Sequence, residues 1–459
     1  MSKIHEHWTS RLGFIMATAG SAIGLGSLWR FPYVAGENGG GAFVLLYLFF
    51  TFLIGLPVFI GELVLGRYSQ KSALLTYYEL SHNSPNWKGL GWLNVFSCLL
   101  ILSYYSVVAG WCLSYVVMSL NKFYVGLEAE QIKQVFNTLY TSPGINLFWF
   151  GLFLLINMGI VFSGVRKGIE HWSKILMPAL FVSLMALFCY ALTLPGFSKA
   201  VTFTFVPDFT KLNASSVLNA LGMAFFSLSV GLGIIITYGS YMNKKDNIPY
   251  NGTLIAFMTV LVSLISALTI FPIVFSFDFP PEAGPGLVFQ TLPVLFAKLP
   301  ASILLSTLFF SLLFFAALTS TISLLETIVA NMLDLFEMKR ETATIIATLL
   351  TFVVGIPSAL SGSDILFPTW KAIYGKNFFD TVNYLTASWF MPFGGLLVTL
   401  FLGWRLNKEI PLQEFGLGTK TQYLAKPWFF MVRWVVPVAV GIIIVQETGL
   451  FNFAHLFKK

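Results

Sequence analysis

The chain has 459 residues, of which 56% are hydrophobic and only 10% are charged, and its formal net charge at pH 7 is +7. A soluble domain carries about a quarter charged residues, so this composition excludes a soluble globular protein and predicts an integral membrane protein. The excess of Lys and Arg lies beside long apolar runs rather than along one basic stripe. This distribution favours a lipid bilayer, and not nucleic acid, as the partner.

Apolar runs long enough to cross a membrane recur from one end of the chain to the other. A spanning helix needs roughly 20 mostly apolar residues. We expect such helices at residues 11–36, 42–70, 88–122, 147–165, 170–194, 216–241, 250–276, 302–336, 341–361, 378–404 and 426–447. Ten-residue segments of alternating polarity, the pattern of a membrane β-barrel, are absent from the sequence. The predicted fold is therefore an all-α polytopic membrane protein with about 11 transmembrane helices.

The distribution of Lys and Arg sets the expected orientation. When the eleven runs alternate across the membrane from a cytoplasmic amino terminus, most of these basic residues fall at cytoplasmic ends. We therefore expect a multi-pass protein of the inner (plasma) membrane, with a cytoplasmic amino terminus and an extracellular or periplasmic carboxyl terminus.

Two of the predicted spans contain the same interruption. The first carries "SAIGLGSLWRFPY", with Gly-Leu-Gly at residues 24–26, and the sixth carries "FFSLSVGLGIIITYGSY", with Gly-Leu-Gly at residues 231–233. A single Gly-x-Gly is more often a close packing contact between helices, and that alternative stays open for each one. Paired interruptions in corresponding halves indicate an inverted-repeat transporter, because unwound backbone presents carbonyls to a cation and amides to an anion.

Few ionisable side chains lie within the predicted spans. Glu62 and Glu326 lie inside the second and the eighth, and Asp380 opens the tenth. Intramembrane carboxylates are costly and often mark ion pathways, although neighbouring groups could equally hold them in a purely structural role. An intramembrane enzyme is disfavoured, because all five histidines fall in tails, loops or span ends and no GxSxG or HExxH motif occurs.

Several motifs carry a resemblance to a known family. They are "HWTSRLGFIMATAGSAIGLGSLWRFPYVAGENGGGAFVLLY" near the amino terminus, then "GRYSQ", "FSLSVGLG", "FFAALTSTIS" and the region of Asp380. Together they resemble the neurotransmitter:sodium symporter family, which includes LeuT-like bacterial amino-acid transporters. The resemblance implies two inverted repeats of five helices, at residues 1–194 and 195–405, with helices 1 and 6 unwound at mid-membrane. Residues 406–459 would hold the eleventh span and the carboxyl-terminal tail.

The resemblance also implies a substrate site beside the two interruptions. Its residues are Ala22, Gly24, Gly26, Ile101, Tyr105, Phe226, Ser227, Ser229, Leu232, Ser320 and Leu324. Monoamine-carrying relatives resemble one another in having aspartate where this chain has Gly24, so the substrate here must supply its own carboxylate. The compartment for the substrate side chain contains no charged residue, and its members are Ile101, Phe226, Leu232 and Leu324. We expect neutral, hydrophobic α-amino acids, because burying an unpaired charge there would be prohibitive.

Two sodium sites follow from the same resemblance. The second site is formed by carbonyl and hydroxyl oxygens, the ligands that a small hard cation requires, and its members are Gly20, Ile23, Ala316, Thr319 and Ser320. The first site is formed by Ala22, Ser27, Ser227 and Thr259. Relatives have asparagine at positions 27 and 259, and a hydroxyl on a shorter stem reaches less far than an amide oxygen. We therefore expect a weakened first site and a stoichiometry near one sodium per amino acid, with a repacked but working first site as the alternative.

Chloride is expected to have little effect. Tyr47, Ser227 and Ser263 match the chloride-binding positions of chloride-dependent relatives. However, Met223 and Thr259 replace amide side chains there, and Ser263 is not the glutamate that substitutes for chloride in independent relatives.

The resemblance assigns an outer gate above the substrate site. Arg30 matches the gate arginine and Asp380 matches its acidic partner. Tyr105 and Phe226 match the lid that lies between this pair and the substrate.

A second gate is implied on the cytoplasmic side. Trp8, Tyr241 and Asp334 match the family pattern, but the gate arginine is replaced by His5. We expect either His5 or Lys3 to be the partner of Asp334.

The function expected from these features is sodium-coupled symport of an amino acid by alternating access. An ion channel and an amino-acid-sensing receptor on a transporter scaffold are the two alternatives. Paired broken helices between two gates favour alternating access over a continuous pore, and a receptor would be expected to carry a signalling domain that this sequence does not contain.

Overall fold

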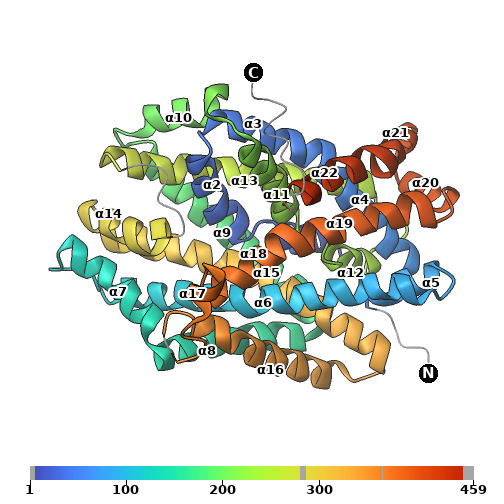
Figure 1. The fold of residues 1–459 in the computed structure, drawn as a ribbon, viewed down its shortest axis with the longest axis horizontal. Helices are drawn as coiled ribbons and strands as arrows, with labels where there is room; N and C mark the ends of the chain where they lie inside the picture. Colours follow the sequence, from blue (N-terminus) through green and yellow to red (C-terminus); the bar gives the residue numbers. More distant parts are fainter. Residues whose placement is uncertain (1–5, 280–285, 364, 448–459) are drawn as a thin grey trace.

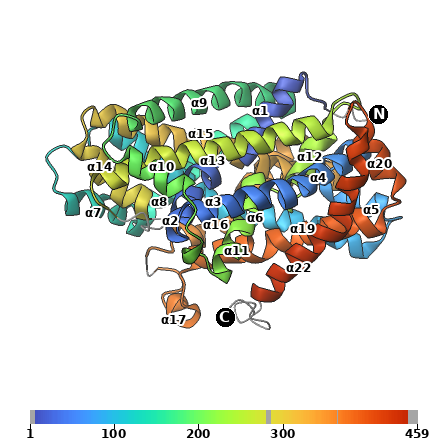
Figure 2. The same ribbon diagram turned by 90° about the horizontal axis from the view of Figure 1, so that it is seen from above.

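The computed structural model describes residues 6–279, 286–363 and 365–447, and these residues form helices and no strands. The long helices lie side by side, mostly along the longest dimension of the molecule (Figure 1), and Figure 2 shows the same arrangement from above. The amino-terminal half contains α1 Arg11–Ala22, α2 Phe31–Glu37, α3 Gly41–Phe50, α4 Leu56–Ser69, α5 Ala73–Leu80, α6 Pro85–Leu120, α7 Ala129–Thr141, α8 Pro143–Phe162, α9 His171–Ala191 and α10 Phe197–Phe205. The remainder contains α11 Ala214–Leu228, α12 Ile234–Ser240, α13 Ile248–Ser276, α14 Leu292–Lys298, α15 Ser302–Phe336, α16 Arg340–Ala359, α17 Trp370–Tyr374, α18 Phe378–Tyr384, α19 Met391–Leu400, α20 Glu409–Gly416, α21 Ala425–Phe430 and α22 Val436–Glu447.

Nine helical segments in the described part of the chain are long and apolar enough to cross a membrane. They coincide with the predicted spans two to five and seven to eleven, and their bounds are Gly41–Ser69, Pro85–Leu120, Pro143–Phe162, Val165–Ala191, Ile248–Ser276, Ser302–Phe336, Arg340–Ala359, Phe378–Arg405 and Gln422–Gln446. The first predicted span is a bent pair of helices that are together long and apolar enough to cross a membrane. The sixth predicted span is present as the short helices α11 and α12. The prediction of an all-α, multi-span protein is therefore confirmed.

The first predicted span is broken where the sequence contains its Gly-Leu-Gly. α1 ends at Ala22, and a π-helical turn, Gly26–Arg30, leads into α2. The two halves are bent by 49° relative to each other. Pro32 lies in the first turn of α2, where its missing amide hydrogen would have no helical partner in any case. The backbone between Ala22 and Gly26 therefore leaves the regular helix.

The break between α11 and α12 contains three residues with positive φ. The angles are 54° at Ser229, 82° at Gly231 and 74° at Gly233. A right-handed helix does not continue through such a conformation, which glycine adopts without the steric cost that a Cβ atom brings. The amide of Gly231 donates to Oε1 of the buried Glu62 of α4 at 2.6 Å. A buried carboxylate thus holds the interrupted backbone in position.

The two breaks lie against the two longest helices of the described chain. α6 has 36 residues and α15 has 35, and these helices pack against each other along much of their length. α1 and α12 both contact α15, whereas α19 contacts α6 and α11. The interrupted segments are therefore surrounded by rigid helices, which position the side chains of the site.

Candidate substrate and ion sites

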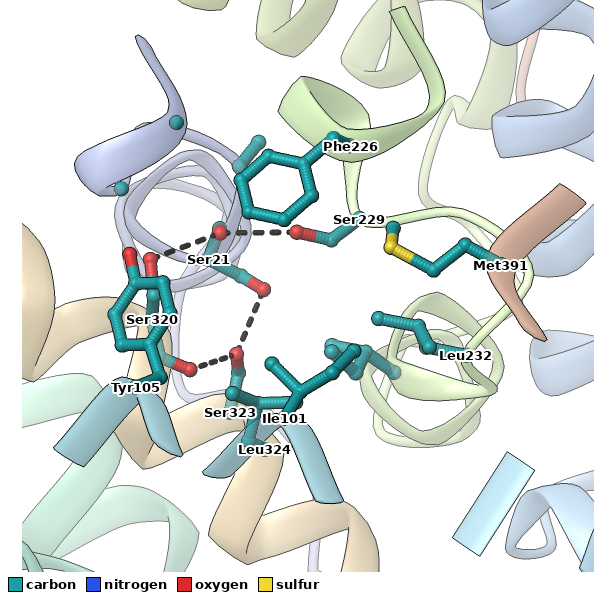
Figure 3. Close-up of a pocket in the computed structure, with 14 residues that line it drawn as sticks. Ser21, Ile101, Tyr105, Phe226, Ser229, Leu232, Ser320, Ser323, Leu324 and Met391 are labelled. Atoms are coloured by element: carbon teal, nitrogen blue, oxygen red, sulfur yellow. Dashed lines mark hydrogen bonds between the residues drawn. The ribbon is translucent and has the colours of Figure 1, made fainter. Parts of the chain in front are cut away.

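A cavity of about 30 Å³ lies between the two helix breaks (Figure 3). It is lined by Ser21, Ala22, Gly24, Gly26, Ile101, Tyr105, Phe226, Ser229, Leu232, Ile234, Ser320, Ser323, Leu324 and Met391. Every predicted substrate residue except Ser227 belongs to this lining. Ser227 does not line this cavity, because its hydroxyl lies on the side of α11 that contacts Tyr47 of α3.

Gly24 and Gly26 lie close to different side chains of the cavity wall. A Cβ atom at position 24 would overlap the hydroxyl of Ser320 and would lie 2.7 Å from Tyr105 Oη. A Cβ atom at position 26 would lie 2.7 Å from ring carbons of Phe226. Glycine is therefore required at both positions for steric reasons, and its backbone approaches the cavity as closely as a backbone can.

Hydrogen bonds join the broken helices to α6 and α15 around this cavity. The amide of Leu25 donates to Tyr105 Oη at 2.7 Å. The hydroxyls of Ser229 and Ser320 both donate to the carbonyl oxygen of Ser21, at 3.1 and 3.2 Å. The residues that end α1 and α11 are thus fixed to each other and to the two long helices (Figure 3).

The far part of the cavity is apolar. Its carbon-rich walls come from four helices and from the second break, through Ile101, Phe226, Leu232, Leu324 and Met391. No charged side chain is among the lining residues described above. The expectation of an uncharged compartment therefore agrees with the geometry of this cavity.

Four lining residues were missed by the sequence reasoning: Ser21, Ile234, Ser323 and Met391. Ser21 is next to the predicted Ala22 and Ile234 is two residues after the predicted Leu232, so a window two residues wider would include them. Ser323 lies about one helical turn after Ser320 on α15, and helical periodicity would point to it. Met391 begins α19 and has no local signal, because only the packing of α19 against α6 and α11 brings it to the cavity.

The residues predicted for the second sodium site lie together where α1 meets α15. The Ser320 hydroxyl, whose proton is shared between the Ser21 and Gly20 carbonyls, lies 3.3 Å from the Gly20 oxygen, and that of Thr319 donates to the Ala316 carbonyl at 3.1 Å. A Cβ atom at Gly20 would lie 3.0 Å from Thr319 Cβ, so the two helices approach closely. Ile23 caps α1 with a backbone outside the helical region (φ −86°, ψ 71°). This group of neighbouring hard oxygens is the type that a small cation prefers.

The hydroxyls predicted for the first sodium site differ in their hydrogen bonding. Ser27 is fully buried and its hydroxyl has no hydrogen-bond partner in the described structure. Those of Ser227 and Thr259 donate to the carbonyls four residues earlier in their own helices, at 2.6 and 2.9 Å. Ala22 lines the substrate cavity. Ser27 is therefore the member of this set whose hydroxyl makes no hydrogen bond within the described structure.

The residues at the predicted chloride positions bond to one another. Tyr47 Oη donates to Ser227 Oγ at 3.2 Å and lies 3.3 Å from Ser263 Oγ. The hydroxyls of Ser227 and Ser263 donate to the carbonyls of Met223 and Thr259, at 2.6 and 3.0 Å. An anion needs donors, and the hydroxyl hydrogens at this position are already used within the protein.

The predicted outer-gate residues lie around a second cavity, of about 60 Å³. Arg30 and Asp380 both line it, but the structure records no ion pair within 4.0 Å between these two described residues. Instead, the guanidinium of Arg30 lies over the ring of Phe226, 4.6 Å from its centre, in a cation–π arrangement. Tyr105 and Phe226 line both cavities, so they separate the two.

The residues predicted for the cytoplasmic gate are packed closely. Trp8 donates from Nε1 to the Tyr238 carbonyl at 3.0 Å, and its ring meets that of Tyr241 edge-on with centres 5.8 Å apart. Asp334 accepts the backbone amide of Ser72 at 2.7 Å. The predicted partners of Asp334, at positions 3 and 5, lie outside the described residues.

A model of the sodium:neurotransmitter symporter family matches this chain at residues 5–141 and 129–374. The chain belongs to this family. An uncharacterized sodium-dependent transporter of Bacillus subtilis (strain 168) is 40% identical to this symporter over 97% of the chain and 98% of its own length. Another, of Haemophilus influenzae, is 33% identical over 97% and 99% of the two lengths.

A solved structure agrees with the family assignment. The crystal structure of MhsT in complex with L-phenylalanine has a TM-score of 0.89 and 40% identity, and the match covers 96% of this chain and 99% of that one. The symporter therefore has the LeuT-like fold that the motifs implied.

One ionic cluster of the symporter was not anticipated from the sequence. Glu326 is fully buried, and Arg340 donates to its two carboxylate oxygens at 2.7 and 2.9 Å. Tyr241 donates to the same carboxylate at 2.6 Å, and Glu6 lies 3.7 Å from Arg340. Of the two alternatives for Glu326, the geometry favours a carboxylate held by neighbouring groups. The sequence contained one signal for this cluster, namely Arg340, a basic residue directly before the predicted span at residues 341–361.

Proposed function

We propose that this symporter couples the uptake of neutral, hydrophobic α-amino acids to sodium by alternating access. The observation that carries the proposal is the cavity between the two helix breaks, with glycine backbone at one end and an apolar compartment at the other. The same cavity offers polar groups for an amino acid's charged ends and carbon surface for its side chain. Small-molecule sites commonly combine a few placed polar groups with such apolar walls.

The steric requirement for Gly24 supports a substrate that carries its own carboxylate. No side chain fits at this position, because a Cβ atom would already overlap Ser320 and approach Tyr105. A protein carboxylate for an amine substrate therefore has no room at this point of the wall. The negative charge beside sodium would instead come from the amino acid.

The walls support a neutral and hydrophobic side chain. Placing an unpaired charge against Ile101, Leu324 and Met391 would cost several kcal/mol or more. MhsT, which has 40% sequence identity to this chain, was crystallised with L-phenylalanine. L-Phenylalanine has a side chain of this class, and aliphatic or aromatic amino acids are proposed here.

The second sodium site is proposed to dominate the coupling, with about one sodium carried per amino acid. Its oxygens already lie next to one another across α1 and α15. The first site is proposed to be weaker because its side-chain ligands are the short hydroxyls of Ser27, Ser227 and Thr259. Chloride is proposed to have little effect because the Tyr47 cluster uses its own donors. The amino terminus is proposed to lie in the cytoplasm, and the protein in the inner membrane.

Uptake by the purified full-length protein in proteoliposomes tests this proposal. We expect accumulation of radiolabelled L-leucine that requires an inward sodium gradient and is unaffected when chloride is replaced by gluconate. Sodium-independent current through the same vesicles would instead indicate a channel. Binding of L-leucine without transport would indicate a receptor, and uptake of amines but no amino acid would contradict the proposed substrate class.

A further inference from the structure

Two serine hydroxyls border the otherwise apolar compartment of the cavity. Ser21 of α1 and Ser323 of α15 both line it, and their Oγ atoms are 2.7 Å apart (Figure 3). Both residues are buried, with exposed fractions of 3% and 0%. The cavity walls beside them are the carbon surfaces of Ile101 and Leu324.

The hydrogen-bond directions at this pair leave one oxygen with spare acceptor capacity. Ser323 donates its proton to the Ser320 carbonyl at 2.7 Å, so its contact with Ser21 must use the Ser21 proton. The phenol of Tyr238 is a further polar neighbour of Ser323. Ser21 Oγ therefore acts as a donor to Ser323, and no described group donates to it.

We propose that the Ser21 hydroxyl determines substrate specificity by accepting a hydrogen bond from the substrate side chain. A hydroxyl oxygen has two acceptor sites, and here they face a cavity whose other walls in this region are carbon. Side chains with a ring-borne donor, a phenol O–H or an indole N–H, satisfy this oxygen and still cover the apolar walls. The symporter therefore prefers tyrosine and tryptophan to otherwise similar side chains that lack the donor. This inference rests on the proposed function.

Inhibition of L-leucine uptake by matched pairs of amino acids tests the proposal. L-Tyrosine is compared with L-phenylalanine, and L-tryptophan with 3-(3-benzothienyl)-L-alanine, in which sulfur replaces the indole N–H. One neutral hydrogen bond corresponds to about a three- to tenfold difference in inhibition constant. We expect that advantage for the donor-bearing member of each pair in the wild-type protein.

Two variants separate the hydrogen bond from general effects on the site. Ser21→Ala removes Oγ and keeps the backbone carbonyl that holds Ser229 and Ser320, so we expect it to abolish the advantage of both donors. Ser106→Ala is the control, since Ser106 is a buried serine of α6 that does not line the cavity, and it should keep the wild-type ratios. The inhibition constant of L-leucine reports general effects on the site, and in Ser106→Ala it should change less than about twofold.

The inference and the proposed function fail in distinguishable ways. Equal inhibition within each pair, or a Ser21→Ala variant that weakens all four compounds and L-leucine alike, would overturn the role of Ser21 and leave amino-acid symport intact. Absence of any sodium-driven L-leucine uptake by the wild-type protein would instead overturn the proposed function itself.

Discussion

At the scale of single residues, the proposed preference for amino acids over amines depends on Gly24. The variant Gly24→Ala adds a methyl group that overlaps Ser320, and overpacking of this kind costs about 1–3 kcal/mol. We expect the inhibition constant of L-leucine to rise by at least about fivefold. Gly159→Ala is the matched control, because a Cβ atom at this position of α8 meets open space. Wild-type affinity in Gly24→Ala would contradict the tight contact on which the substrate class depends.

At the same scale, variants of Thr319 and Ser27 test the two proposed sodium sites. Loss of a ligand whose neighbours stay unsatisfied costs about 1–3 kcal/mol, so Thr319→Ala should raise the sodium concentration for half-maximal uptake by at least about fivefold. Ser27→Ala should change it by less than about twofold, with a hyperbolic wild-type curve. The measurement is the sodium dependence of L-leucine uptake. A sigmoidal wild-type curve that becomes hyperbolic in Ser27→Ala would show instead that the first site is occupied.

At the scale of elements, the broken helices were predictable and their neighbours were not. Glycine is favoured where the backbone adopts positive φ, so Gly231 and Gly233 mark the second break directly. Ser229 also has positive φ, and a serine gives no such signal. Met391 and Arg340 reach their sites only through packing between helices distant in sequence, a kind of information that local patterns do not contain.

The second break provides a prediction about an element as a whole. In Gly231→Ala the new Cβ atom would overlap the Met391 carbonyl, in a residue with φ 82°. Alanine at such a position destabilises by more than about 1 kcal/mol. We expect a lower apparent melting temperature in detergent and weaker L-leucine binding, because the strained segment also lines the cavity.

The control for this prediction is again Gly159→Ala, at which the melting temperature should stay the same or rise slightly, since alanine favours the helix. If Gly231→Ala melted at the wild-type temperature and bound normally, the positive φ at this break would have no energetic role.

At the scale of the whole molecule, alternating access requires that contacts on one side of the cavity break while those on the other side form. Trp8 is 3% exposed, and its ring packs on Tyr241 at the gate predicted for the cytoplasm. Tyr241 also donates to Glu326, which Arg340 neutralises. Tyr241 therefore belongs both to the aromatic contact and to the ionic cluster. Because the cluster holds Tyr241 in place, it is suited to keeping this gate closed.

Removing one partner of this buried cluster gives the last prediction. Arg340→Gln leaves the fully buried Glu326 without a cation, and breaking a buried pair costs about 3–5 kcal/mol. We expect the gate to open, so that a cysteine at Ala330, in the 490 Å³ cavity on this side, reacts at least about fivefold faster with a polar maleimide. The background carries Cys189→Ala, because Cys189 is exposed.

The double variant Arg340→Gln/Glu326→Gln removes both charges and should be labelled more slowly than Arg340→Gln alone, because no uncompensated charge is left buried. Lys133→Ala is the control, since it breaks only the exposed pair with Glu130, and such pairs contribute less than about 1 kcal/mol. Unchanged labelling in Arg340→Gln, or equal labelling in the single and double variants, would show that this cluster does not hold the gate closed.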